Sequence, residues 1–339
     1  MTRDSFSTCR QSTNRRFRAI LFTSFALLMA GNAAANPEGG TVASGSATIV
    51  KESPGKLTVK QQSNRTVINW RNFSIGEGEQ THFQQPPGGA ALNRVTSSQV
   101  SRILGKLTAT GKVFLVNPNG VVFGKNAQVD VSALVSSIHD VRNRDFMAGR
   151  LRFTIPGHAD AKITNQGTIS VKEGGLVALV APSIENSGII YARLGRVALA
   201  AGDAVTIDPY GDDLITFEVP EGVAAQLTDP DHNPAAALID LSGNILANGG
   251  GVLITADKAR SVVDNAVNMT GFVEARSLST RGGKVILRGG SGNVTVDGTI
   301  DTSGLGAASG GEVRVTTDGS LTMTSQGRIL AEGGTDGGG

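Results

Sequence analysis

The sequence predicts an all-β protein that folds as a parallel β-helix, a column of stacked coils. Glycine accounts for 45 of the 339 residues and aromatic residues for only 4%, and short runs of Val, Ile and Leu lie between the glycines. Short β-branched runs bounded by turn residues are typical of strands. In the second half these runs recur every 20 to 29 residues, which is the length of one coil of a solenoid.

The first 35 residues have the features of a secretory signal peptide. Five arginines form a basic start, an apolar run follows at 19–30, and three alanines at 33–35 offer a cleavage site before Asn36. The apolar run is shorter than the roughly 20 residues that span a bilayer. This favours a signal peptide over the alternative of an uncleaved membrane anchor. We therefore expect residues 1–35 to be removed after export through the Sec machinery.

The mature chain is close to neutral and has no cysteine. Residues 1–35 carry five Arg and one Asp, so their removal changes the formal charge from +2 to −2. Cys9, the single cysteine, lies in the signal peptide. Nucleic-acid binding proteins carry clusters of excess Lys and Arg, and the overall charge of the mature chain indicates no nucleic-acid partner.

A two-part repeat marks the coils. Its first part is Gly-x-Ile or Gly-x-Val, as in Gly167-Thr-Ile169 and Gly188-Ile-Ile190, and it returns with longer spacing at Gly243, Gly271, Gly298 and Gly327. Its second part is Gly-x-Val-x-aliphatic, which starts at Gly175, Gly195, Gly250, Gly283 and Gly311. We expect strands of successive coils to lie about 4.8 Å apart, with Ile169, Ile190 and Ile245 aligned in one interior stack.

A helical repeat and a β-sandwich explain the repeat less well than a parallel β-helix does. A helical repeat is disfavoured because each glycine costs about 1 kcal/mol in a helix interior. A β-sandwich remains the alternative within the all-β class, although it gives no reason for the constant position of the Gly-x-Ile units. The repeat breaks at 205–238, where Pro, Gly and Asp are frequent. We expect this segment, with a short strand at 214–219, to lie outside the coils as an insertion or hairpin.

The first half holds an ordered set of motifs between residues 64 and 124. Asn64-Arg65-Thr66 is followed by Asn69-Trp70, then by Phe-Gln-Gln-Pro at 83–86 and Leu-Asn-Arg-Val at 92–95. Leu-Gly-Lys-Leu at 104–107 comes next, and the set ends with Asn117-Pro118-Asn119-Gly120 between two apolar runs. The set and its order are far more specific than any one of these short motifs.

With these motifs the chain resembles the secretion domain of two-partner-secretion exoproteins, the filamentous haemagglutinin N-terminal domain family. The resemblance covers residues 37–275 and is most specific over 64–137. It implies a right-handed parallel β-helix with an N-terminal cap and extra-helical β-hairpins. It also implies export through an outer-membrane β-barrel transporter of the Omp85 type. We therefore expect a secretion domain at 36–275 and the start of a β-helical repeat region at 276–339, which continues in a longer protein.

The resemblance marks nine residues as a candidate secretion motif that the transporter recognises: Asn64, Arg65, Thr66, Asn93, Arg94, Asn117, Pro118, Asn119 and Gly120. Read from the residues alone, Asn117–Gly120 is a tight turn, because Pro118 fixes φ and Asn or Gly accepts positive φ. Arg65 and Arg94 either brace loops through carbonyl oxygens or meet the transporter. Trp70 is expected in the core of the cap.

The sequence offers little for catalysis or cofactor binding. His82, His139, His158 and His232 are scattered and the mature chain has no Cys, so we expect no metal site and no cofactor. Asp208, Asp212 and Asp213 are interpreted as a solvated loop rather than a catalytic or calcium site.

Members of the resembled family are adhesins, haemagglutinins, cytolysins, haem-acquisition factors or contact-dependent toxins, so we expect a secreted or cell-surface protein. A host or neighbouring-cell receptor or glycan would be bound by the region downstream. A polysaccharide-active β-helix enzyme and a classical autotransporter passenger are the alternatives; the enzyme requires carboxylates in a groove on adjacent coils.

Overall fold

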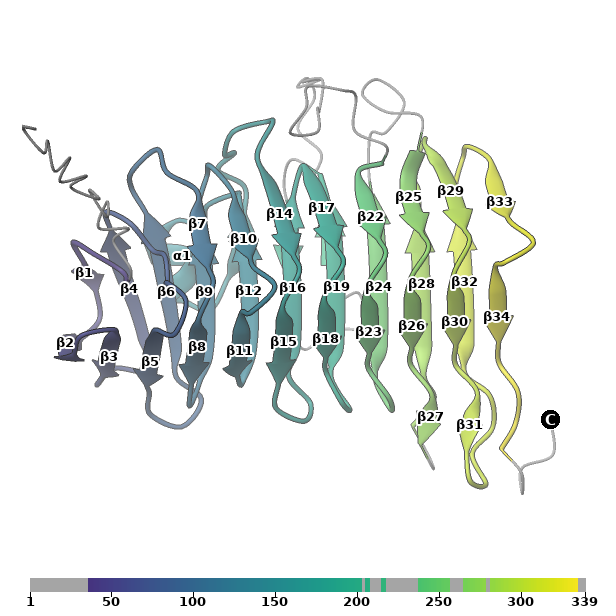
Figure 1. Cartoon of the computed structure of the whole chain (residues 1–339), viewed down its shortest axis with the longest axis horizontal. Coiled ribbons are helices and arrows are strands. Elements are labelled where there is room, and N and C mark those ends of the chain that lie inside the picture. The colour runs from purple at the N-terminus through teal and green to yellow at the C-terminus, as the bar shows by residue number, and fades with distance from the viewer. Residues whose placement is uncertain are drawn as a thin grey trace, which may run out of the picture. The chain divides into compact units, whose positions relative to one another are not determined.

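The structure is a computed structural model, and it describes residues 36–202, 205–207, 215–217, 237–256, 265–278 and 281–334. The chain divides into two compact units, Met1–Asn32 and Ala33–Gly339, and all described residues belong to the second. Within that unit three sheets run the length of a column of stacked coils (Figure 1). The predicted signal peptide and the loop with Asp208, Asp212 and Asp213 lie outside the described residues.

The first sheet has ten strands, in the spatial order β1 (Thr41–Ser44), β4 (Arg65–Trp70), β6 (Ala90–Val95), β9 (Lys112–Val116), β12 (Ala133–Ser137), β16 (Leu176–Ala181), β19 (Arg196–Ala201), β24 (Gly251–Ala256), β28 (Lys284–Arg288) and β32 (Glu312–Thr316). All neighbours from β4 onward are parallel and in register. This sheet contains every second-part repeat of the sequence.

The second sheet has eight strands: β7 (Ser101–Ile103), β10 (Val121–Phe123), β14 (Lys162–Asn165), β17 (Ser183–Asn186), β22 (Ile239–Leu241), β25 (Asn265–Met269), β29 (Asn293–Val296) and β33 (Leu321–Met323). The third has eleven: β2 (Ala47–Ser53), β3 (Lys56–Gln61), β5 (Gln80–Gln84), β8 (Lys106–Ala109), β11 (Gln128–Val131), β15 (Thr168–Val171), β18 (Ile189–Tyr191), β23 (Asn244–Leu246), β26 (Phe272–Glu274), β30 (Thr299–Asp301) and β34 (Arg328–Leu330). A typical coil passes from the second sheet to the third and then to the first.

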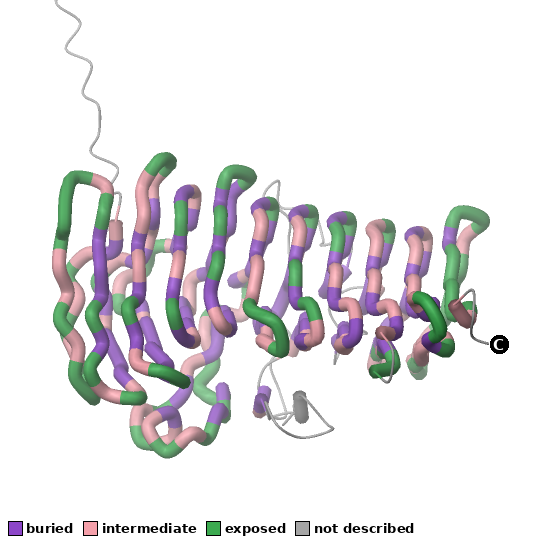
Figure 2. Tube along the Cα trace, turned by 90° about the horizontal axis from the view of Figure 1, so that it is seen from below, coloured by how far each residue is buried: buried purple, intermediate pink, exposed green. Residues whose placement is uncertain are grey.

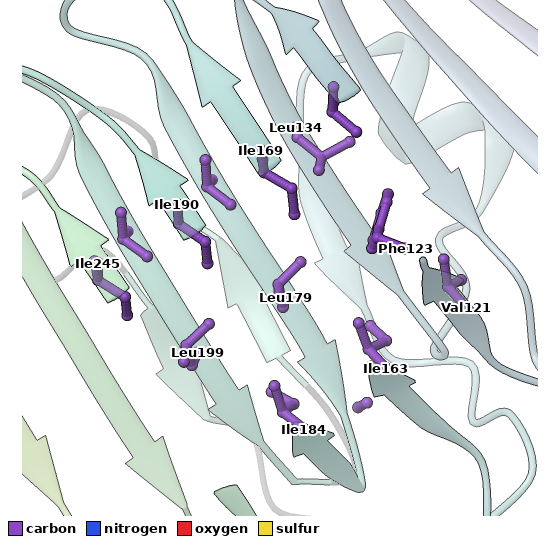
Figure 3. Close-up of a cluster of buried hydrophobic side chains, with 14 of the residues drawn as sticks. Val121, Phe123, Leu134, Ile163, Ile169, Leu179, Ile184, Ile190, Leu199 and Ile245 are labelled. Carbon is purple, nitrogen blue, oxygen red and sulfur yellow. The ribbon is translucent and has the colours of Figure 1, made fainter. Parts of the chain in front are cut away.

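The interior of the column is one continuous apolar core. Ile169 pairs with Ile190 and Ile190 with Ile245, and the ladder continues through Val273, Ile300 and Ile329. Figure 3 shows Ile169, Ile190 and Ile245 on successive coils with their side chains in one stack, and all three are fully buried. Buried positions recur in each coil along the column (Figure 2). The predicted parallel β-helix and its interior stack are confirmed, which excludes the β-sandwich.

The Gly-x-Ile glycines are required because neighbouring coils pass too close for a side chain. A Cβ at Gly243 would overlap the carbonyl oxygen of Gly188, and a Cβ at Gly271 would overlap that of Gly243. The amide nitrogens of the following residues donate to the same carbonyls, as Asn244 does to Gly188 at 2.9 Å. The constant glycine in the repeat is therefore a stacking requirement.

Antiparallel strands close the N-terminal end of the column. β2 pairs antiparallel with β3 and β1 with β4, so these two strands cover edges that would otherwise be open to pairing with other chains. Beneath this cap Trp70 packs edge-on against Phe73, with ring centroids 5.7 Å apart. Trp70 is buried, as expected for the core of a cap.

Outside the coils lie the short helix α1 (Asn143–Met147) and a three-stranded antiparallel sheet of β13 (Leu151–Phe153), β20 (Val205–Ile207) and β21 (Ile215–Phe217). The described strands of the 205–238 segment thus lie outside the coils, as predicted. α1 and β13 were not predicted. A second apolar cluster joins Phe146, Phe153 and Val205 to the outer face of the first sheet.

The two-stranded pair β27 (Ser277–Leu278) and β31 (Gly304–Leu305) extends two of the last coils. In the described part of the chain, no helix is both long enough and apolar enough to cross a bilayer.

Candidate functional site

The segments that contain Arg65, Arg94 and Asn117 lie side by side in the structure. They belong to β4, β6 and the end of β9, which are neighbours in the first sheet, with Asn69 paired to Arg94 and Arg94 to Val116. Of the nine motif residues, only Asn64 is classed as exposed. Four are buried, namely Thr66, Asn93, Asn117 and Gly120, and the others are half-buried.

Arg94 binds four acceptors around the start of α1. Its Nε lies 2.7 Å from Oδ2 of Asp140, and its terminal nitrogens donate to the Val141 carbonyl at 2.8 Å and to Asn143 Oδ1 at 2.9 Å. It also donates to Asn69 Oδ1 at 3.1 Å. The planar guanidinium suits several acceptors at once, so Arg94 ties the extra-helical segment to the coils.

Arg65 contacts the same segment in a different way. Its guanidinium carbon lies 5.6 Å from the centroid of the Phe146 ring of α1, within the range of a cation–π contact. Phe146 in turn packs edge-on against Phe114, with centroids 5.1 Å apart. Arg65 and Arg94 therefore hold α1 from opposite ends of adjacent strands.

Asn93 and Thr66 use their polar groups inside the fold. Asn93 is fully buried, accepts a hydrogen bond from Trp70 Nε1 at 3.0 Å, and donates to the carbonyls of Ala91 and Phe114. Thr66 Oγ1 is 2.8 Å from Ser63 Oγ. The exposed Asn64 contributes its carbonyl, which accepts from the Ala90 amide at 2.9 Å.

Asn117–Gly120 forms the corner between β9 and β10. Asn117 is fully buried; its Nδ2 donates to Gln99 O at 2.9 Å and Ser101 Oγ at 3.0 Å, while its Oδ1 accepts from the Asn119 amide at 3.0 Å. Gly120 has φ +120° and donates to Asn117 O at 3.2 Å. Asn119 does not use a positive φ; its Nδ2 instead donates to the carbonyl of Ser97 at 2.8 Å.

The Asn117→Ala variant tests the corner. It removes two side-chain donors and one acceptor from a buried site, leaving polar groups of Gln99 and Asn119 without these partners. We expect a loss of about 2 to 3 kcal/mol in the free energy of unfolding, since each unmade buried hydrogen bond costs about 1 to 3 kcal/mol. Chemical denaturation measures this. Asn119→Ala, at a half-buried position, is the matched control with the smaller expected loss.

Several residues of this site were not found from sequence. Asp140, Asn143 and Phe146 complete the contacts of Arg94 and Arg65, yet they lie 46 to 81 residues further along the chain in a segment with no repeat. His139, buried beside them, places its Nε2 2.7 Å from the Gly202 carbonyl. The sequence feature that could have indicated this segment is the pair Phe146 and Phe153. Aromatic residues are rare in this chain, and these two belong to the second apolar cluster.

Among the described residues, two pairs of carboxylates are register neighbours on adjacent coils, as a polysaccharide-active enzyme would need: Glu185 with Asp240, and Glu274 with Asp301. Glu185 of β17 and Asp240 of β22 are register neighbours, and burial, with a smaller contribution from Glu185, raises the pKa of the Asp240 carboxyl. Glu185 is bound by Lys162 Nζ at 2.7 Å, and Asp240 accepts from Asn268 at 3.2 Å. None of these carboxylates is among the residues that line the surface hollow around Arg196, Gly251 and Lys284 or the one around Asn244, Phe272 and Thr299. Among the described residues no group of three His, Cys, Asp or Glu side chains is placed to hold a metal.

The fold and these contacts define a class of protein: a capped parallel β-helix in which short motifs fasten an extra-helical unit to the first coils. Comparison with known proteins gives the family. The sequence profile of the TPS secretion domain matches residues 33–302, so the chain belongs to the family of two-partner-secretion (TPS) secretion domains. This is a family of secretion domains rather than of enzymes; its members are exported and work with a partner transporter.

Similar proteins agree with this assignment. The chain is 29% identical over 266 residues to a heme/hemopexin-binding protein of Haemophilus influenzae, and 30% identical over 277 residues to the protein of the same name from strain Rd. These alignments cover 72% and 79% of this chain but only 27% and 29% of those proteins. The chain thus spans less than a third of the length of the curated relatives it matches.

A solved structure is similar over most of the chain. The crystal structure of the HMW1 secretion domain from Haemophilus influenzae has 29% sequence identity and a TM-score of 0.73, covering 88% of this chain and 74% of that one. The predicted family and fold class are confirmed. The autotransporter and enzyme alternatives are not favoured.

Proposed function

We propose that an outer-membrane β-barrel transporter of the Omp85 type recognises this secretion domain, and that the domain folds as a β-helix after translocation. The family match carries the proposal. The protein is then secreted or displayed at the cell surface after Sec-dependent entry into the periplasm. The boundary between the secretion domain and the repeat region falls near residue 275 in this proposal.

The stacked architecture supports folding from the N-terminal end. The antiparallel cap strands β1 and β2 close that end, so new coils add in one direction only. Each added coil pairs its three strands with the coil before it and buries a new set of interior side chains. Burial releases about 25 cal/mol per Å² of apolar surface, which favours forward movement of the chain without a nucleotide.

The nine motif residues serve export mainly by holding this fold. In the folded domain four of them are buried and Arg94 is engaged with four acceptors, so they contribute to export through the free energy released when the chain folds outside the outer membrane. The domain itself is not an enzyme, and the receptor or glycan of the whole protein is bound downstream of it.

Co-expression tests the export proposal. The full chain is produced with and without the transporter that accompanies the exoprotein, and the chain is measured in the medium and at the cell surface. We expect export only with the transporter, and retention in the periplasm with an unrelated outer-membrane barrel. Equal export without any transporter would reject the proposal.

A further inference from the structure

A basic hollow lies on the outer face of the first sheet, towards the C-terminal coils. It has a volume of about 630 Å³ and is lined by residues of β19, β24, β28 and β32 and their adjoining turns. Its cationic lining residues are Arg196, Arg281, Lys284, Arg288 and Arg314. No Asp or Glu is among the described lining residues. Glu312 lies beside two of them, 3.1 Å from Lys284 Nζ and 2.9 Å from Arg314.

The hollow exists because glycine interrupts a ladder of long side chains. Arg196 pairs with Gly251 and Gly251 with Lys284, so the middle rung between two cations has no side chain. The floor is apolar, since Leu253 is buried and Leu194 and Ile286 are half-buried. Arg281, Lys284, Arg288 and Arg314 are exposed at the walls.

The spacing of the cations suits a linear polymer with repeated anionic groups. Arg196 and Lys284 are two rungs apart, about 10 Å along the column, and Lys284 and Arg288 are four residues apart on one strand, about 13 Å across it. Strands paired on both sides hold these positions rigidly. A single small anion would engage only one or two of these cations, whereas a chain laid across the coils can engage several of them at once.

The chemistry of the hollow selects among polyanions. An acidic peptide would gain most by pairing its backbone with a sheet edge, but β24 and β28 are already paired on both sides. Single-stranded nucleic acid is held by aromatic side chains on which bases stack, and no described lining residue is aromatic. A sugar ring needs neither a free sheet edge nor an aromatic side chain. Its C–H faces can lie on the apolar floor while its charged substituents reach the arginines.

We propose that this basic hollow binds a linear sulfated polysaccharide. The forked arginine guanidinium groups bind tetrahedral oxyanions through two parallel hydrogen bonds, and Leu253 and Ile286 contact the sugar rings. This binding is separate from the export step, because the lining residues of the hollow are not among the nine motif residues.

Binding of a heparin hexasaccharide to the purified chain tests the proposal by isothermal titration calorimetry. The Arg281→Gln/Arg288→Gln variant should bind at least tenfold more weakly, and the slope of log Kd against log salt should fall by about two, one for each contact removed. The control is Arg102→Gln/Arg152→Gln, which removes the same charge from exposed positions elsewhere and should stay within twofold. Circular dichroism confirms that both variants are folded.

Three outcomes would overturn the proposal. An equal loss of affinity in both double variants would mean attraction by net charge alone. Equal binding of the desulfated hexasaccharide would remove the role of the sulfates. Tighter binding of polyglutamate or of a single-stranded oligonucleotide would assign the hollow to an acidic protein or to nucleic acid. A normal level of export for the Arg281→Gln/Arg288→Gln variant is expected in every case.

Discussion

Gly243→Ala is expected to lower the free energy of unfolding by about 3 to 5 kcal/mol, among the largest effects of a single methyl group in this chain. The added Cβ would overlap the carbonyl oxygen of Gly188, which is backbone and cannot move without separating two coils. The hydrogen bond from Asn244 to that carbonyl would be lost with it. Chemical denaturation followed by circular dichroism measures the change.

The control for this prediction is Gly282→Ala. A Cβ at Gly282 would meet nothing within 4 Å, and Gly282 has no positive φ. We expect a change within about 0.5 kcal/mol, typical of exposed positions. If Gly243→Ala were as mild as its control, the coils could not be packed as closely as described.

Arg94→Met is expected to cost about 2 to 4 kcal/mol and to loosen the extra-helical unit selectively. Removing one partner of a buried ion pair costs about 3 to 5 kcal/mol, and the lower range applies because the side chains of Arg94 and Asp140 are 17% and 24% exposed. Asp140, Asn143 and the Val141 carbonyl all lose a donor. Limited proteolysis between residues 140 and 152 should accelerate before the coils unfold.

Two further variants make this prediction specific. Arg71→Met breaks the exposed pair with Glu38, whose side chains are 67% and 39% exposed, and should cost at most about 1 kcal/mol. Adding Asp140→Asn to Arg94→Met removes the carboxylate left without its cation, so the double variant should be less destabilised than the sum of the single variants. An additive result would argue against a direct Arg94–Asp140 interaction.

The repeating part of the fold could be predicted because each coil repeats the same local rule. Glycine marks the place where backbones of neighbouring coils touch, and the aliphatic residue two positions later points inward, so the interior positions of Ile190 and Ile245 follow from the repeat alone. The corner at Asn117–Gly120 followed from turn chemistry. Asn119 and Gly120 can both accept a positive φ; in the structure Gly120 takes that conformation, and Asn119 binds the Ser97 carbonyl instead.

The extra-helical hairpin within 205–238 was predicted, but α1, β13 and the contacts that hold them could not be, because those contacts are long-range and not repeated. α1 is held by Arg65 and Arg94, which come from strands far earlier in the chain, and by the apolar outer face of the first sheet. No local periodicity in the sequence indicates that the outer face of the first sheet is covered by another element. The same limit applies to the basic hollow, whose five cations come together only when β19, β28 and β32 are stacked.

In the proposed export mechanism, the motif residues contribute a stable fold rather than a surface that the transporter reads directly. Export yield is best compared between Asn117→Ala and an interior variant of equal measured stability. Ile190→Val or Ile190→Ala provides that variant, because such truncations lower the free energy of unfolding by about 0.5 to 5 kcal/mol. We predict equal export of the two variants. Much weaker export of Asn117→Ala than of its stability-matched partner would contradict the account and assign Asn117 to direct recognition by the transporter.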